Sequence, residues 1–132
     1  MSTQKHVLVI DDEVVVREAV EDILESIDIV VISAGDGREG IALFQAHRDK
    51  ISGILLDMKM PGLSGPDTLR ELRQLDPHIP VILSSGYSED ETKKAIADQG
   101  PAIFLPKPYN FEELIAKVEE LLRLDDDETD DE

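Results

Sequence analysis

The chain is predicted to fold as a doubly wound α/β domain, with a five-stranded parallel sheet between two layers of helices. Five short apolar runs are separated by longer stretches that have the apolar spacing of helices. The runs are apolar throughout instead of alternating, which is typical of parallel strands buried on both faces. The expected strands are Val7–Ile10, Ile29–Ile32, Ile54–Leu56, Val81–Leu83 and Ile103–Leu105.

Helical spacing is clearest in the first and last intervening segments. Apolar residues recur there three or four positions apart, so that they share one face of a helix. The last helix is expected to begin after Asn110, which can form a capping box with Glu113. In the first segment the residues are Val16, Val20, Ile23, Leu24 and Ile27, and in the last they are Leu114, Ile115, Val118, Leu121 and Leu122.

Composition limits the classes of protein to which the chain can belong. Its 132 residues are enough for one domain with a buried core. No apolar run has the roughly 20 residues needed to cross a bilayer, and we expect neither a signal peptide nor membrane attachment. The chain has no cysteine, which excludes disulfide and thiolate chemistry, and its net charge of −17 argues against direct binding of nucleic acid. We therefore expect a cytoplasmic protein.

Part of the acidic charge is concentrated at the C-terminus, although the rest of the chain is also acidic. Seven of the eight residues from Asp125 to Glu132 are Asp or Glu. A run of like charges is usually a solvated tail, and the alternative is a segment that contacts a basic partner. The sequence therefore predicts a domain over residues 1–124 and a mobile acidic tail over residues 125–132.

Acidic residues and one lysine follow three of the expected strands. Asp11 and Asp12 come after the first strand, Asp57 directly after the third, and Lys107, followed by Pro108, after the fifth. Because the carboxyl ends of parallel strands lie at one edge of a sheet, these side chains are expected to meet there. Carboxylates gathered in this way repel one another unless a cation lies among them or one stays protonated. The lysine suggests that an anion also binds, and a divalent metal with a phosphoryl group meets both requirements.

Four segments carry a resemblance to a known family. They are Val9-Ile10-Asp11-Asp12-Glu13, Leu55-Leu56-Asp57-Met58-Lys59-Met60-Pro61 with Gly65, Leu83-Ser84-Ser85-Gly86 and Leu105-Pro106-Lys107-Pro108. Together, on five strand–helix units, they make nearly the whole chain before the tail resemble the receiver domain of bacterial two-component response regulators. The resemblance implies a flavodoxin-like three-layer sandwich with strand order 2-1-3-4-5. In that order the first and third strands are neighbours, and the strand order reverses between them. The aspartates are expected at this reversal, where ligands of such sheets bind.

The resemblance also implies a role for each residue of the acidic site. Asp57 matches the aspartate that accepts the phosphoryl group. Asp11 and Asp12 match the pair that binds Mg²⁺ together with Asp57 and the backbone carbonyl of Lys59, a set of oxygen ligands that suits this ion. Lys107 is expected to contact the phosphoryl oxygens, and its peptide bond to the following proline is expected to be cis.

Further residues match the switch and tuning positions of the family. Ser85 matches the hydroxyl that contacts the phosphoryl group; Ser84 is the competing choice, but Gly86 follows Ser85, as the family pattern requires. Phe104 occupies the aromatic switch position, although a strand phenylalanine is as often simply part of a core, and Tyr109 fits that position less well. Lys59 and Tyr87 occupy the two positions that tune hydrolysis of the phosphoaspartate. Since Tyr87 is bulky enough to shield the phosphorus, we expect slow self-dephosphorylation.

The implied function is a phosphorylation-dependent signalling switch, not an enzyme that turns over a metabolite. Its expected phosphodonor is a histidine kinase or a phosphotransfer protein, because His6, His47 and His78 are scattered and read as surface residues. A downstream protein partner is expected on the face of the fourth helix, fifth strand and fifth helix. The segments Ser85–Ser88 and Phe104–Tyr109 resemble those of receivers attached to hybrid histidine kinases, which leaves open whether the chain acts alone or within a longer protein.

Two other functions also place carboxylates or phosphate groups at such a sheet edge. A metal-dependent phosphohydrolase that forms an aspartyl phosphate commonly has a second aspartate two residues after the nucleophile, where this chain has Lys59. A flavin-binding electron carrier of the same topology needs a Ser/Thr/Gly-rich phosphate loop after the first strand, where this chain has Asp11-Asp12-Glu13. Both alternatives are therefore disfavoured.

Overall fold

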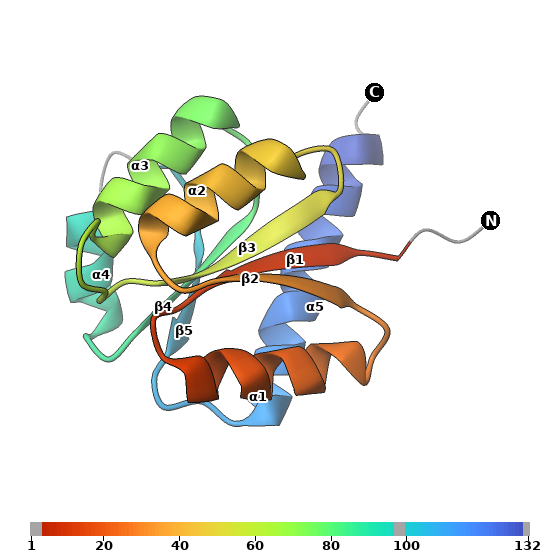
Figure 1. Cartoon of the computed structure of the whole chain (residues 1–132), viewed down its shortest axis with the longest axis horizontal. Helices are drawn as coiled ribbons and strands as arrows, with labels where there is room; N and C mark the ends of the chain where they lie inside the picture. The colour runs from red at the N-terminus through yellow and green to blue at the C-terminus, as the bar shows by residue number, and fades with distance from the viewer. Residues whose placement is uncertain (1–3, 97–99, 131–132) are drawn as a thin grey trace.

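The computed structural model describes residues 4–96 and 100–130, and it has the predicted architecture (Figure 1). Five parallel strands form one sheet in the order β2-β1-β3-β4-β5, which confirms the expected topology. Along the chain the elements are β1 (His6–Ile10), α1 (Val14–Glu25), β2 (Val30–Ala34), α2 (Gly37–Ala46), β3 (Ile51–Asp57), α3 (Gly65–Leu75), β4 (Val81–Ser85), α4 (Glu89–Ala95), β5 (Ile103–Pro106) and α5 (Phe111–Asp130).

Two apolar clusters, one on each face of the sheet, hold the layers together. Helices α1 and α5 cover one face, and α2 and α3 cover the other (Figure 1). Side chains of a strand alternate between the faces, so Val9 and Leu55 pack towards α1 and α5 with Val20 and Val118. The opposite cluster contains Phe44, which is fully buried. Burial on both faces explains why the strand runs are apolar at every position.

The first helix is shorter than its apolar pattern predicts. Val20 and Leu24 are buried on its inner face, as expected. Ile27 was expected on the same face, but this prediction is wrong, because α1 ends at Glu25 and the chain then turns. Asp28 adopts a φ of 68°, and Ile27 is left 36% exposed in the turn before β2.

The last helix begins as predicted and continues further than expected. The Asn110 N–H donates to Glu113 Oε1 at 2.9 Å and the Glu113 N–H donates to Asn110 Oδ1 at 2.8 Å, which confirms the capping box. Helix α5 runs on through residues 125–130, where the acidic tail was expected to start. Residues 131–132 lie outside the described residues, and a division between a domain at 1–124 and a mobile tail at 125–132 stays a prediction.

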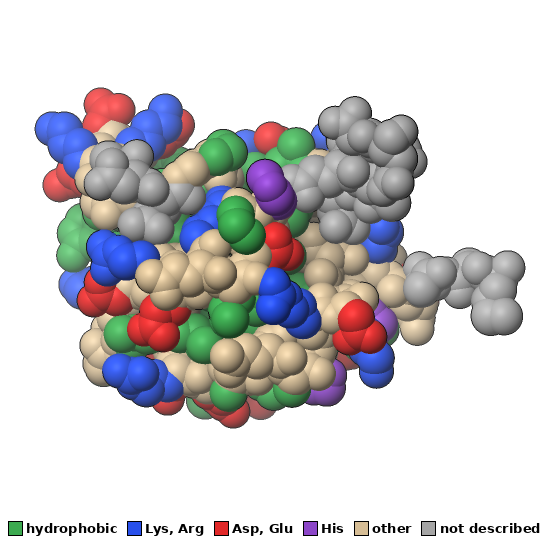
Figure 2. Space-filling view, turned by 90° about the horizontal axis from the view of Figure 1, so that it is seen from above, with side chains coloured by type: hydrophobic (Ala, Val, Ile, Leu, Met, Phe, Trp, Pro, Cys, Tyr) green, Lys and Arg blue, Asp and Glu red, His purple; other side chains and the backbone are tan. Residues whose placement is uncertain are grey.

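The surface over α2 and α3 is ordinary solvent-facing surface. Figure 2 shows acidic, basic and apolar side chains intermixed on this face. On α3, Arg70 and Asp67 form an exposed ion pair with an N–O distance of 2.6 Å. Among the helices of residues 4–96 and 100–130, none is both long enough and apolar enough to span a bilayer.

Candidate functional site

Three aspartates meet at the carboxyl ends of β1 and β3, as predicted. Asp11 and Asp12 follow β1, and Asp57 is the last residue of β3. One carboxylate oxygen from each residue lies within 4.8 Å of the other two. Asp11 and Asp57 are each only 4% exposed, whereas Asp12 is exposed to solvent. The group is therefore a partly buried set of oxygen ligands that opens to solvent on the Asp12 side.

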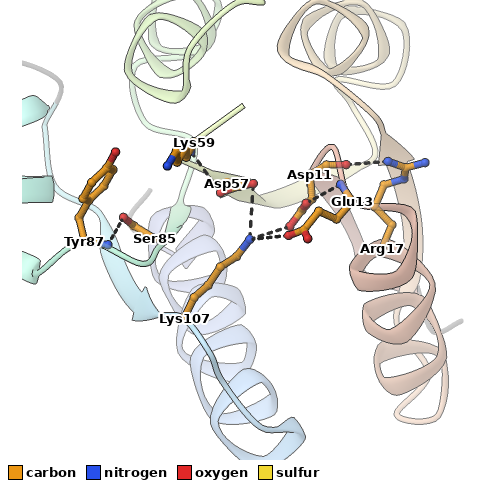
Figure 3. A network of polar contacts seen from close by, with 8 residues as sticks. All are labelled: Asp11, Glu13, Arg17, Asp57, Lys59, Ser85, Tyr87 and Lys107. Carbon is orange, nitrogen blue, oxygen red and sulfur yellow. Dashed lines mark hydrogen bonds and ion pairs between the residues drawn. The ribbon is translucent and has the colours of Figure 1, made fainter. Parts of the chain in front are cut away.

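The Lys107 ammonium lies among the carboxylates of this group (Figure 3). Its Nζ is 3.3 Å from Asp11 Oδ2, 3.5 Å from Asp57 Oδ2 and 3.6 Å from Glu13 Oε1. The lysine comes from the loop between β5 and α5, and its peptide bond to Pro108 is cis, as the resemblance implied. The Lys107 ammonium therefore faces the carboxylates of Asp11, Asp57 and Glu13.

Backbone groups fix the direction of the two buried carboxylates. Asp11 Oδ1 accepts a hydrogen bond from the Glu13 N–H at 2.9 Å, and Asp57 Oδ1 accepts one from the Lys59 N–H at 3.2 Å. The backbone after β3 is held in turn by the start of α3. A Cβ at Gly65 would lie 2.4 Å from Met58 Cα, so only glycine allows this approach. The site is thus oriented by the main chain as well as by its ion pairs.

The local electrostatics disfavour the ionised form of Asp57. Burial raises the pKa of its carboxyl group from the ordinary 3.8 to about 6, and the Asp11 carboxylate adds to the rise. The Lys59 N–H and the Lys107 ammonium act in the opposite direction but do not cancel it. Burial also lowers the pKa of Lys107, but Asp11 and Asp57 outweigh burial and raise it above its ordinary 10.5. The burial of Asp57, more than the charges around it, therefore accounts for its raised pKa.

The two neighbouring serines lie differently with respect to Asp57. Ser85, the predicted switch hydroxyl, is buried, and its Oγ accepts a hydrogen bond from the Tyr87 N–H at 2.9 Å. The Lys107 N–H donates to the Ser85 carbonyl at 2.8 Å, which ties β4 to the lysine loop. Ser84 is the register partner of Asp57 on β4, so both side chains leave the sheet on the same face. The assignment of the switch to Ser85 stays a prediction.

Within the described part of the chain, the side chains of the other residues with predicted roles form no hydrogen bond or ion pair with the three aspartates. Phe104 is partly exposed on β5, the edge strand, and it is not part of either core cluster. Lys59 and Tyr87 are both exposed, and the Lys59 ammonium lies 5.9 Å from the centre of the Tyr87 ring. A cation at this distance from a ring is weakly attracted to it. The two positions predicted to tune hydrolysis are therefore in contact with each other.

Two residues of the site were missed by sequence reasoning. Glu13 pairs with Lys107, and Arg17 donates from Nη1 to the Asp11 carbonyl oxygen at 2.7 Å. Glu13 directly follows the aspartate pair, so its place at the edge of the site could have been expected from adjacency. The partner of Arg17 depends on the path of the β1–α1 loop, which no sequence spacing specifies.

The raised pKa of Asp57 predicts how stability depends on pH. Between about pH 4 and about pH 6 the folded chain binds more protons at Asp57 than the unfolded chain does, so ionisation of this group lowers stability as pH rises. Asp57→Asn cannot ionise. With a chelator present, its free energy of unfolding relative to the wild type should increase across this range, by up to about 3 kcal/mol, and level off near pH 7. Urea unfolding at several pH values measures the difference, and a difference independent of pH would contradict the account.

Comparisons with known proteins agree with this geometry. The family model described as the response regulator receiver domain matches residues 7–119. The sensor kinase CckA of Brucella abortus is 32% identical over 96% of the chain, and the response regulator MprA of Mycolicibacterium vanbaalenii is 34% identical over 89% of it. The chain spans only 13% of the length of CckA and 50% of that of MprA.

A solved structure of a related protein has the same fold. A chain of the crystal structure of the CheX–CheY–BeF3–Mg²⁺ complex from Borrelia burgdorferi superposes with a TM-score of 0.83. The two are 26% identical, and the match covers 90% of each chain. The strand order, the acidic group with its facing lysine, and the family match over residues 7–119 lead to one conclusion. The chain belongs to the response regulator receiver domain family.

Proposed function

We propose that the chain is a cytoplasmic phosphorylation-dependent signalling switch in which Asp57 accepts a phosphoryl group from a histidine kinase or a phosphotransfer protein. The observation that carries the proposal is the group of Asp11, Asp12 and Asp57, whose oxygens lie within 4.8 Å of one another, with Lys107 facing Asp11 and Asp57. Such a group has sites for a cation and for an anion side by side. A phosphohydrolase or a flavin carrier finds no support in the family match or in the residues of the site.

The residues present fit a magnesium ion. Their donors are carboxylate oxygens, the ligands that this hard cation prefers, and the exposed side of Asp12 leaves room for water ligands. Burial and the Asp11 carboxylate disfavour the ionised form of Asp57, and a bound cation would favour it. Mg²⁺ held by Asp11, Asp12, Asp57 and the Lys59 carbonyl would offset charge on the carboxylates and on the incoming phosphoryl oxygens. The related CheY complex with BeF3 and Mg²⁺ supports this choice of ion.

Asp57 is the nucleophile in the proposed transfer. One of its carboxylate oxygens forms a bond to phosphorus while the bond from phosphorus to the histidine nitrogen breaks, and the histidine leaves with that electron pair. Such a transfer depends mainly on positioning and on charge neutralisation. The Lys59 N–H holds Asp57 Oδ1, and Lys107, only 3.5 Å from Oδ2, is placed to move onto the phosphoryl oxygens.

The proposed switch follows from the connections of the site to β4 and β5. Ser85 would move its hydroxyl towards the phosphoryl group, and the space it leaves would admit the Phe104 ring. Ser85 and Lys107 are already joined through the backbone, and Phe104 lies on the same strand, β5, that leads to Lys107. Partial exposure of Phe104 supports this role, because the ring is not fixed in a core cluster. The downstream partner would bind the α4–β5–α5 face that changes shape.

The phosphodonor would dock beside the site, on α1 and the start of α5. An apolar groove of about 510 Å³ runs from Lys107 along α1. Its lining includes Val15, which is 78% exposed, and Phe111, which is 58% exposed. Exposed apolar side chains next to the reactive carboxylate suit a protein surface that presents a phosphohistidine.

Phosphorylation by a small donor tests the proposed function. Incubation with acetyl phosphate and Mg²⁺ should add one phosphoryl mass to the intact protein, and hydroxylamine should remove it, because acyl phosphates react with this nucleophile. Asp57→Asn and chelation of the metal should each abolish the gain, whereas Asp67→Asn, which changes an exposed aspartate of α3, should leave it unchanged. No gain under conditions that phosphorylate another receiver, or an equal gain in Asp57→Asn, would contradict the proposal.

The contact between Lys59 and Tyr87 predicts a long-lived phosphoaspartate. Neither side chain is suited to position a hydrolytic water, and Tyr87 next to Ser85 would shield the phosphorus. Tyr87→Ala should therefore shorten the lifetime severalfold, while Phe111→Ala, another exposed aromatic residue, should not. Intact-mass measurements after removal of acetyl phosphate follow the decay. A wild-type lifetime of only seconds without a phosphatase, or equal lifetimes for wild type and Tyr87→Ala, would refute slow self-dephosphorylation.

A further inference from the structure

Arg17 has a contact that the proposed phosphoryl chemistry does not use. Its side chain extends from α1 to the loop that carries the acidic pair, as Figure 3 shows, and Nη1 donates to the Asp11 carbonyl oxygen at 2.7 Å. The hydrogen bond is partly buried and involves a charged donor, so it is stronger than an exposed neutral one. Arg17 therefore holds the main chain of a proposed metal ligand without contacting the carboxylate itself.

The backbone after β2 holds the guanidinium from the other side. A Cβ at Gly35 would lie 3.3 Å from Arg17 Nη1 and 3.7 Å from Cζ, so the guanidinium packs against this glycine. Glu39 Oε1 accepts a hydrogen bond from the Gly35 N–H at 2.7 Å and fixes the turn. The Asp11 N–H donates to the Ala34 carbonyl at 3.1 Å, so the loop is tied to the end of β2 through two contacts.

We propose that Arg17 is a positioning residue for the metal site: by holding the Asp11 carbonyl against the β2–α2 turn, it keeps the Asp11 and Asp12 carboxylates facing Asp57. The inference rests on the proposed function, because it takes the aspartates to be the Mg²⁺ ligands. Partners that orient metal ligands typically change metal affinity by about 10–100-fold when they are removed.

A positioning role and a purely electrostatic role predict opposite effects. Arg17 is a cation near a site for a cation, so if only its charge mattered, its removal would tighten Mg²⁺ binding. If its hydrogen bond to Asp11 orients the loop, removal weakens binding although one repulsive charge has gone. A role in helix packing alone would lower the melting temperature and leave the affinity of the folded protein unchanged. The sign of the change in affinity therefore separates the three roles.

The experiment is calorimetric titration of Mg²⁺ into the wild type, Arg17→Met, Arg17→Lys and Gly35→Ala, each first shown to be folded by its melting curve. Arg17→Met should weaken Mg²⁺ binding about tenfold or more. Arg17→Lys should recover part of the affinity, because lysine can donate one hydrogen bond to the carbonyl. In Gly35→Ala the added Cβ would lie 3.3 Å from Arg17 Nη1 and push the guanidinium aside, so this variant should weaken Mg²⁺ binding less than Arg17→Met does. Arg70→Met removes a cation from an exposed ion pair on α3 and serves as the matched control, with unchanged affinity.

Amide hydrogen exchange gives a second readout that does not depend on metal. In Arg17→Met the Glu13 N–H, which donates to Asp11 Oδ1, should exchange faster than in the wild type or in Arg70→Met. Unchanged or tighter Mg²⁺ binding by Arg17→Met, beside normal binding by the wild type, would overturn the positioning role alone. Absence of Mg²⁺ binding by the wild type would instead contradict the proposed metal site, and the positioning role with it.

Discussion

The mutual repulsion of buried carboxylates is the constraint on which the functional edge of this protein depends. Asp11 and Asp57 are each 4% exposed, and the single ammonium of Lys107 lies between them. Charges that are shielded from water interact more strongly than they would in water. Repulsion between the two buried carboxylates therefore has a large effect on the stability of their ionised forms. Burial first, and repulsion from the Asp11 carboxylate in addition, raise the pKa of Asp57 to about 6. A cation bound at the proposed metal site would offset the repulsion between these carboxylates.

The rest of the fold keeps these charges together. Parallel strands packed on both faces cannot shift without breaking two apolar clusters, so the ends of β1 and β3 stay side by side. Hydrogen bonds from backbone N–H groups then fix the directions of the side chains in the site and the position of the lysine loop. The Glu13 and Lys59 amides orient the two carboxylates, and the bond from the Lys107 N–H to the Ser85 carbonyl joins the lysine loop to β4. A frame that holds like charges this close together suits a site whose charge is altered by binding a cation or a phosphoryl group.

Much of this could be predicted from the sequence, for identifiable reasons. Apolar runs such as Val7–Ile10 predict strands directly, and parallel strands bring Asp11, Asp57 and Lys107 to one edge. The partners of Arg17 and Ser84 could not be predicted in this way. The first depends on the path of a loop, and the second on the register that pairs Ser84 with Asp57. The end of α1 was misplaced because the apolar residue Ile27 continues the helical pattern into a turn.

If charge balance is what couples metal to phosphoryl binding, each ligand should strengthen the binding of the other. The most direct measurement is the affinity for Mg²⁺ with and without beryllofluoride, an anionic analogue of the phosphoryl group, by calorimetric titration. Mg²⁺ should bind severalfold more tightly when beryllofluoride is present, and this gain should disappear in Asp57→Asn. Equal Mg²⁺ affinity with and without beryllofluoride, in a wild-type protein that binds both, would show that the two sites are independent and would contradict the account.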